Sequence, residues 1–227
     1  MGSAAMRIID LTMPIITDHV RWKAERTVAG DTTKGDLFQV TTIKVSCHSF
    51  THVDARRHYF GDGPTIEATP LEDVVGDAAV IDLMDVEPNE AVGPEKLEAR
   101  FGHVRPGDMI LFKSGWDAKR SYRTKEFWLD APYLTREAAL FLKDKGVRTI
   151  AYDFPQDYAI RLLLHGEIRP IEEHVTHDIL LRAGVNMIEY VVNTTAITAD
   201  RVLLSAAPLK IPGADGAPAR VYAIEGR

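Results

Sequence analysis

Three of the eight histidines in the chain lie close together with an aspartate, within residues 47–58. Imidazole and carboxylate groups are the ligands that Zn²⁺, Mn²⁺ and Fe²⁺ take from proteins, so this cluster predicts a metal site. A surface loop with solvated side chains is the alternative, but the apolar residues that precede the cluster favour partial burial. The candidate ligands are His48, His52, Asp54 and His58.

Neither regular backbone brings these four groups together. A straight strand rises about 3.3 Å per residue, which would hold His48 and His52 roughly 13 Å apart. A helix puts the same two histidines on one face but rotates Asp54 away from it. We therefore expect residues 38–45 to form a strand and the chain to bend after it, with the ligands at the bend.

A second candidate group lies near residues 171–192. The pattern predicts a helix over 171–183 and a strand over 186–192. His174 and His177 share one face of that helix, and we expect only one of them to reach the cluster. Glu189 lies among apolar residues, where an ionised carboxylate is costly unless it is paired or coordinates a cation. A metal ion would supply that partner.

The cluster resembles the signature of a known family. His48-x-x-x-His52-x-Asp54-x-x-x-His58, followed by Gly61-Asp62-Gly63-Pro64, is similar to the motif of the cyclase-type metal-dependent hydrolases. That family includes bacterial kynurenine formamidase and isatin hydrolase. The likeness extends to residues 9–12, 106–116 and 132–153, and to His177 and Glu189.

The resemblance implies roles for individual residues. His48, His52 and Asp54 would hold one ion, and Asp54 would share a second with His177 and Glu189. His58 would act as the acid and base. An aromatic contact to substrate is implied near Trp22, for which packing on the domain body is an equal alternative. Zinc is the first choice of ion and manganese the alternative, with one or two ions per chain left open.

Two residues depart from the family pattern. Phe50 stands where the family usually has glycine, so we expect the bend to differ in detail, because glycine adopts dihedrals that phenylalanine disfavours. Arg56 stands where the family usually has proline. This permanent cation either disfavours a second ion or binds an anionic part of the substrate.

The predicted activity is hydrolysis of a small linear or cyclic amide. A metal lowers the pKa of bound water from about 15.7 toward about 7, which provides hydroxide for attack on a carbonyl. An arylformamidase is the leading activity, followed by isatin-type ring opening. A metal-dependent lyase or cyclase is one alternative. A non-catalytic binding homologue is the other, suggested by the two substitutions in the motif.

Composition bounds the class of protein. The 227 residues suit one α/β domain, with residues 1–5, and optionally 224–227, treated as tails. A net charge of -6 gives no basic surface for nucleic acid or an anionic membrane. Cys47 is the one cysteine, which fits a cytoplasmic location and suggests a small apolar residue rather than a nucleophile. No apolar run is long enough to span a membrane.

Alternating strand and helix patterns predict an α/β fold with a mixed sheet. The family resemblance implies the swivelling β/β/α (cyclase-like) architecture and a homodimer or homotetramer whose neighbouring subunit lines the pocket. We expect residues 17–36 and 115–132 to be long loops, and Thr135 to cap a helix over 137–145.

Overall fold

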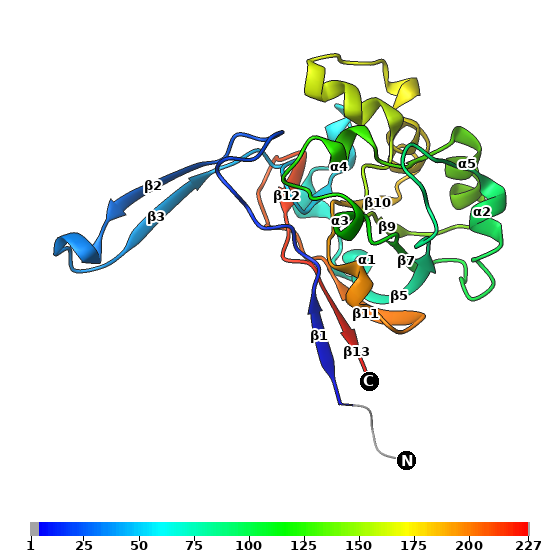
Figure 1. The fold of residues 1–227 in the computed structure, drawn as a ribbon, viewed down its shortest axis with the longest axis horizontal. Helices are drawn as coiled ribbons and strands as arrows, with labels where there is room; N and C mark the ends of the chain where they lie inside the picture. Colours follow the sequence, from blue (N-terminus) through cyan, green and yellow to red (C-terminus); the bar gives the residue numbers. More distant parts are fainter. Residues whose placement is uncertain (1–4, 227) are drawn as a thin grey trace.

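The computed structural model describes residues 5–226 and has one large mixed sheet at its centre (Figure 1). Among these residues, nine strands form the sheet, in the spatial order β1 (Arg7–Asp10), β13 (Tyr222–Glu225), β11 (Arg201–Ser205), β5 (Val75–Asp82), β7 (Met109–Lys113), β9 (Thr149–Ala151), β10 (Asn186–Glu189), β4 (His52–Asp54) and β12 (Gly216–Pro218). The four central strands β5, β7, β9 and β10 are parallel, and the outer strands pair antiparallel. The expected α/β fold with a mixed sheet is confirmed.

Alternation along the strands divides the core between the two faces of the sheet. On β7, Ile110 and Phe112 join a cluster that includes the helices, whereas Met109 and Leu111 join a second cluster on the opposite face. The second cluster also contains Val53 from β4 and Val202 from β11. Because strands from both halves of the sheet share this second cluster, the sheet curls around it.

Within the described part of the chain, five short α-helices accompany the sheet: α1 (Leu71–Val74), α2 (Pro94–Glu98), α3 (Trp116–Lys119), α4 (Glu126–Leu129) and α5 (Arg136–Asp144). The predicted cap of α5 is confirmed, since the Thr135 hydroxyl accepts a hydrogen bond from the Ala138 amide. A small parallel pair of strands, β6 (Ala91–Val92) and β8 (Tyr133–Leu134), lies before α5.

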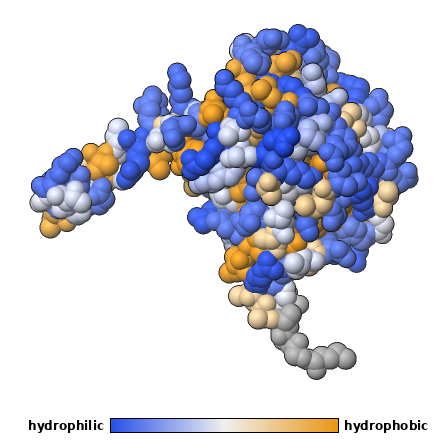
Figure 2. Space-filling model, in the orientation of Figure 1, coloured by the Kyte–Doolittle hydropathy of each residue, from blue (hydrophilic) through white to orange (hydrophobic). Residues whose placement is uncertain are grey.

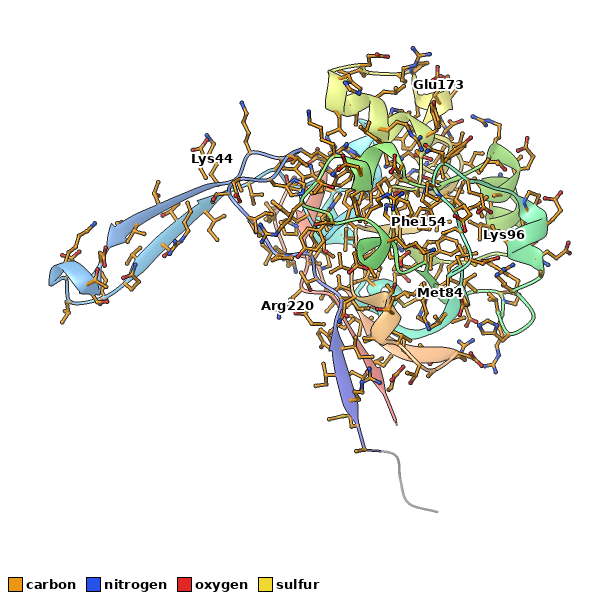
Figure 3. All side chains as sticks on the ribbon, viewed as in Figure 1. Lys44, Met84, Lys96, Phe154, Glu173 and Arg220 are labelled. Carbon is orange, nitrogen blue, oxygen red and sulfur yellow. The ribbon has the colours of Figure 1, made fainter. Side chains whose placement is uncertain are left out.

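The prediction of an irregular loop over residues 17–36 was wrong in its second half. Strand β2 (Glu25–Gly30) pairs with β3 (Val40–Lys44) to form a hairpin that we call the arm (Figure 1). The arm reaches away from the body, and its side chains, Lys44 among them, project into solvent (Figure 3). Alternation of β-branched and polar residues signalled β3, but the polar character of β2 concealed its partner.

Two further predictions need correction. Residues 115–132 contain the short helices α3 and α4 rather than one continuous loop, and the fully buried side chains of Trp116, Phe127 and Trp128 anchor these helices. The helix expected over residues 171–183 is broken into a 3₁₀ turn, η5 (Ile171–Glu173), and a π-helical turn, η6 (His177–Leu181).

The prediction that residues 224–227 form a tail was wrong for its first two residues, which belong to a strand. Ile224 and Glu225 belong to β13, opposite Ile8 and Arg7 of β1. The Glu225 carboxylate also accepts hydrogen bonds from the amides of Thr198 and Ala199. Of the residues treated as tails, 1–4 and 227 lie outside the described part of the chain. None of the helices described is long and apolar enough to cross a membrane.

Candidate metal centre

Strands β4 and β10 bring three of the candidate ligands together. His52 and Asp54 lie two residues apart on β4 and therefore point to the same face, and His52 stands opposite Glu189 in the antiparallel register. His52 Nε2 lies 3.1 Å from Asp54 Oδ1 and 3.6 Å from Glu189 Oε2. The bend was expected to carry all the ligands. Instead His52 and Asp54 lie on a short strand just beyond it.

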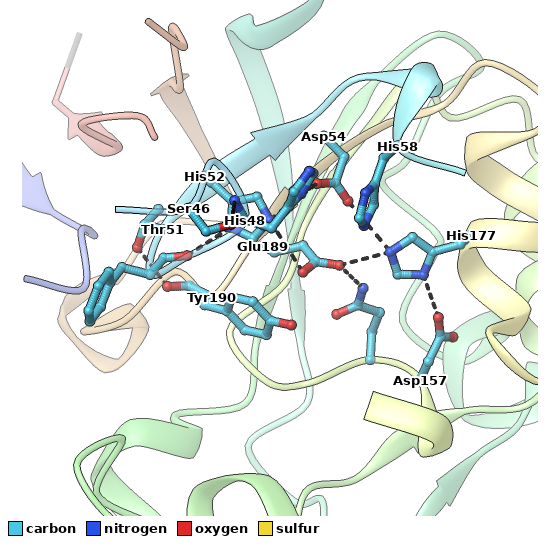
Figure 4. Close-up of polar contacts among 12 residues, drawn as sticks. Ser46, His48, Thr51, His52, Asp54, His58, Asp157, His177, Glu189 and Tyr190 are labelled. Carbon is cyan, nitrogen blue, oxygen red and sulfur yellow. Dashed lines mark hydrogen bonds and ion pairs between the residues drawn. The ribbon is translucent and has the colours of Figure 1, made fainter. Parts of the chain in front are cut away.

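His177 completes this group from the other side (Figure 4). It begins the π-helical turn η6, a geometry that is common at functional sites. Its Nε2 atom lies 3.5 Å from Asp54 Oδ2 and 3.3 Å from Glu189 Oε1. His52, Asp54, His177 and Glu189 are all buried. The structure thus gathers four of the five predicted metal ligands in one buried group.

The fifth, His48, lies in the turn before β4. Its Nδ1 atom is 2.8 Å from Asp54 Oδ1, and its Nε2 atom is 3.2 Å from Asp215 Oδ2. The His58 ring stacks on the His48 ring at a centroid separation of 3.6 Å. His48, Asp54 and His58 each present a ligand atom within 4.8 Å of the others. Asp54 therefore lies between two pairs of histidines, His52 with His177 on one side and His48 with His58 on the other.

The donor set fits a divalent cation. His52 Nε2 and Asp54 Oδ2 are buried atoms without a hydrogen-bond partner among residues 5–226, although buried polar atoms are normally paired. His52 Nδ1 donates to the Phe50 carbonyl at 2.8 Å, and His177 Nδ1 donates to Asp157 Oδ2 at 2.6 Å. In the neutral form of each ring, this bond keeps the proton on Nδ1 and leaves the Nε2 lone pair free, as metal-ligating histidines require.

Phe50 keeps the bend despite replacing the usual glycine. Its φ of 60° lies in the left-handed region, which is unfavourable for a bulky residue. The side chain is buried and packs on Trp22 at a ring separation of 4.9 Å. Burial of the ring offsets part of a backbone cost of about 1–3 kcal/mol. We expected Phe50 to change the bend in detail. The structure shows Phe50 in the left-handed backbone conformation that glycine favours.

The charges of the site depend strongly on one another. Burial raises the pKa of Glu189 and the nearby Asp54 charge adds to that, but His177 and His52 outweigh both and lower it to about 2. Burial lowers the pKa of His48, but Asp54 and Asp215 raise it to about 8. The adjacent buried carboxylates of Asp54 and Glu189 form an environment that a bound cation stabilises.

The pKa of His58 shifts in the opposite direction from that of His48. Burial lowers its pKa to about 4, although the neighbouring carboxylates of Asp54 and Glu189 act against that shift. The imidazole is therefore neutral at pH 7. Its Nδ1 atom lies 4.0 Å from Asp215 Oδ2. A neutral imidazole at the edge of the cluster can accept a proton from water, as an acid and base must.

A cavity of about 200 Å³ opens onto these residues. Its walls include Trp22, which stacks on His19 and is only partly buried, so Trp22 both packs on the body and lines the cavity. Arg56 is exposed and lines a different cavity, next to Pro64 and Asp73. The cavity at the ligand cluster, which we call the site cavity, is lined by Arg21, Trp22, Ser46, His48, His58, Tyr59, Ile160, Leu163, His174, His177, Glu189 and Tyr190.

His174 lines the same cavity, beside His177. It is buried, and its Nδ1 atom is 3.0 Å from the Tyr59 hydroxyl. Burial raises the pKa of Tyr59 to about 12, so this hydroxyl keeps its proton. His165 ends the 3₁₀ segment η4 (Tyr158–His165) and is exposed.

Sequence reasoning missed three residues that hold the ligands. Asp157 fixes His177, and Gln156 donates a hydrogen bond to Glu189 Oε1. Asp215 faces both His48 and His58 from the segment before β12. The adjacent pair Gln156 and Asp157 follows a predicted strand, at the edge where α/β proteins often place functional side chains, and this was the available signal. Nothing local marks Asp215.

The family model for putative cyclases matches residues 9–156, which include His48, His52, Asp54 and His58. The chain belongs to this family. A kynurenine formamidase of Bacillus mycoides is 28% identical over 218 residues, covering 93% of this chain and 94% of that protein. The corresponding enzyme of Bacillus anthracis is 27% identical over the same length.

Solved structures agree with this assignment. A potential metal-dependent hydrolase with cyclase activity superposes with a TM-score of 0.75 at 30% identity, covering 98% of this chain and 99% of that one. An isatin hydrolase bound to the product analogue thioisatinate has a TM-score of 0.83 at 19% identity, covering 98% and 93% of the two chains. At that identity the second match shows the fold alone. The predicted cyclase-like architecture is confirmed.

Proposed function

We propose that this chain is a metal-dependent hydrolase of a small linear or cyclic amide, with an N-formyl aryl amide as the leading substrate. One observation carries the proposal. His52, Asp54, His177 and Glu189 converge in a buried group that leaves His52 Nε2 and Asp54 Oδ2 without partners among residues 5–226. The kynurenine formamidases that resemble the chain over 93% of its length support this choice of substrate class.

In this proposal His48, His52 and Asp54 are metal ligands, and Asp54 lies between the two histidines. His177 and Glu189 complete the ligand set, with zinc as the first choice of ion and manganese as the alternative. A divalent cation bound there supplies Lewis acidity toward a carbonyl and a nucleophilic water at neutral pH. Asp157 and the Phe50 carbonyl orient the two ring nitrogens that face the ion.

His58 moves the proton. Being neutral at pH 7, its imidazole accepts a proton from water and returns it to the leaving nitrogen, which could not otherwise depart. Trp22 and the apolar side chains of Ile160 and Leu163 bound the space where the substrate sits and limit the water that enters. Arg56 remains a proposed contact for an anionic group near the site, although it faces a neighbouring cavity.

Turnover and metal content test this proposal together. Protein loaded with zinc or manganese is assayed with N-formylkynurenine and with isatin, before and after chelation. We expect turnover that chelation abolishes and metal restores. His52→Ala should lose metal by elemental analysis, whereas His58→Ala should keep the metal and lose turnover. Unchanged turnover in the chelator would contradict the mechanism.

Isotope labelling separates the alternatives. Hydrolysis in ¹⁸O-labelled water places the label in the acid product, whereas a lyase or cyclase reaction on the same carbonyl leaves it unlabelled. Tight binding of these substrates without turnover would favour a non-catalytic binding homologue.

The proposal includes a homodimer or homotetramer. Several apolar side chains on the arm are exposed, with Leu37 at 92%, Phe38 at 62% and Ile43 at 54% (Figure 2). Exposed apolar groups that cluster on a segment projecting from the body mark an interaction surface. A second copy of the chain is the proposed partner, consistent with the assembly that the family resemblance implies.

A further inference from the structure

Arg21 enters the cavity on a short segment whose backbone is fixed. The buried His19 ring accepts hydrogen bonds at Nδ1 from the amides of Arg21 and Trp22, at 3.2 and 3.4 Å. The other ring nitrogen of His19 bonds to the Tyr122 carbonyl at 2.8 Å. One imidazole thus ties this segment to the loop before α4, so Arg21 has a defined position.

The guanidinium of Arg21 is also held in place. One terminal nitrogen donates to the Ile160 carbonyl at 3.0 Å. The central carbon lies 4.7 Å from the centroid of the Trp128 ring and 5.6 Å from that of Trp22, within cation–π distance of both. An arginine has five N–H donors, and among residues 5–226 Ile160 provides the one acceptor for this side chain. Most of the donors of Arg21 therefore remain available.

Arg21 lines the same cavity as His48, His58, His177 and Glu189. It is the one lysine or arginine among the described residues that line this cavity. The cavity is also lined by the aromatic rings of Trp22 and Tyr190 and by the aliphatic side chains of Ile160 and Leu163. A small molecule with its amide at the ligand cluster would thus meet apolar groups along its length and a fixed guanidinium.

We propose that Arg21 binds a carboxylate of the substrate, so that the enzyme acts on small amides that carry a carboxylate a short distance from the scissile bond. The planar fork of a guanidinium matches the two oxygens of a carboxylate. A single cation in a cavity that also holds Glu189 suits a monoanion better than a phosphate dianion. This inference rests on the proposed amide hydrolysis and names its substrate class.

Paired substrates test the role of Arg21. Meta-formamidobenzoate and the neutral meta-formamidobenzamide are compared by kcat/KM with metal-loaded wild type, Arg21→Gln, Arg21→Lys and Arg123→Gln. Arg123 is exposed, and its replacement removes the same charge from the neighbourhood of His19. We expect the wild type and Arg123→Gln to prefer the carboxylate by about tenfold or more, and Arg21→Gln to lose the preference. Arg21→Lys should retain part of it.

A purely structural role for Arg21 would lower kcat/KM equally for both substrates, and this result would overturn the inference, as would a wild type without preference. Binding of meta-acetylbenzoate and of acetophenone, measured by calorimetry on the same metal-loaded proteins, gives a second readout that needs no turnover. A carboxylate preference that disappears in Arg21→Gln supports the anion subsite even when neither formamide is cleaved, in which case the proposed hydrolysis alone has failed. No preference in the wild type overturns the subsite.

Discussion

The Thr51 hydroxyl donates a hydrogen bond to the backbone carbonyl of Tyr190 at 2.7 Å, and it accepts one from the Met13 amide at the same distance. Phe50 and Tyr190, with φ of 60° and 58°, both occupy the left-handed region next to proposed ligands. Thr51 therefore links two strained positions, Phe50 before His52 and Tyr190 after Glu189.

Replacing Thr51 by valine should disturb this link. Both hydrogen bonds are buried, so their loss leaves an unpaired amide and an unpaired carbonyl, which should lower the free energy of unfolding by about 1–3 kcal/mol. Metal affinity should fall with it, since both flanking strands lose their connection. Thr51→Ser, which keeps the hydroxyl, is the control and should behave nearly as the wild type. Urea unfolding and a metal competition titration measure the two effects, and equal stability of both variants would refute the link.

Asp157 should control metal affinity without touching the ion. Its Oδ2 atom accepts from His177 Nδ1 and from the Thr176 hydroxyl, and its Oδ1 atom accepts from the Thr176 amide. Asp157→Asn keeps the volume but weakens the bond that orients His177, so metal affinity should fall by about 10–100-fold.

The matched control is Asp178→Asn. Asp178 neighbours His177 in sequence but pairs with Arg136 and Arg182 near the surface, so its replacement should leave metal affinity unchanged. A competition titration against a chelating dye compares the two variants. Equal metal affinity in wild type and Asp157→Asn would show that His177 needs no orienting partner.

Local patterns were enough to predict part of this site. His48, His52, Asp54 and His58 lie within one short segment, so their spacing alone indicated a metal site. Glu189 could be selected because an acid in an apolar strand needs a partner. The buried parallel strands could also be predicted, because continuous apolar runs such as the first four residues of β7 are typical of strands covered on both faces.

Other features depend on contacts between distant parts of the chain. Asp215 reaches His48 only because β12 pairs with β4, and no local pattern indicates that pairing. The π-helical turn at His177 departs from the ordinary helix that the apolar periodicity favoured, so periodicity missed it. Strand β2 was missed because it has little to bury within the chain, and burial is what makes a strand detectable in a sequence.

The arm should govern self-association. Leu37→Glu combined with Phe38→Glu places two charges among its exposed apolar groups, and we expect the proposed oligomer to dissociate at concentrations at least about tenfold higher than for the wild type. The fold of the body should be unaffected, because the arm projects from it (Figure 1). Thr41→Glu, which adds charge to an exposed polar position of the arm, is the control. Sedimentation equilibrium measures the association, and a monomeric wild type would refute this role.

Asp153 should give stability a distinct pH dependence. It is fully buried, and burial raises the pKa of its carboxyl from an ordinary 3.8 to about 6, although Ser114, Gly115 and Thr194 donate hydrogen bonds that act against the shift. A raised folded-state pKa means that the native protein holds the proton more tightly than the unfolded chain does. The stabilisation is therefore complete below about pH 4 and is lost as the pH rises through 6.

The difference in unfolding free energy between wild type and Asp153→Asn isolates this effect, because every other titrating group is common to both proteins. Two pKa units correspond to about 3 kcal/mol. From pH 4 to pH 7 the wild type should therefore lose about this much unfolding free energy relative to Asp153→Asn. Urea unfolding at several pH values measures it. A flat difference would mean that the four donors keep the carboxylate ionised throughout this range, and their hydrogen bonds would then outweigh the cost of burying the charge.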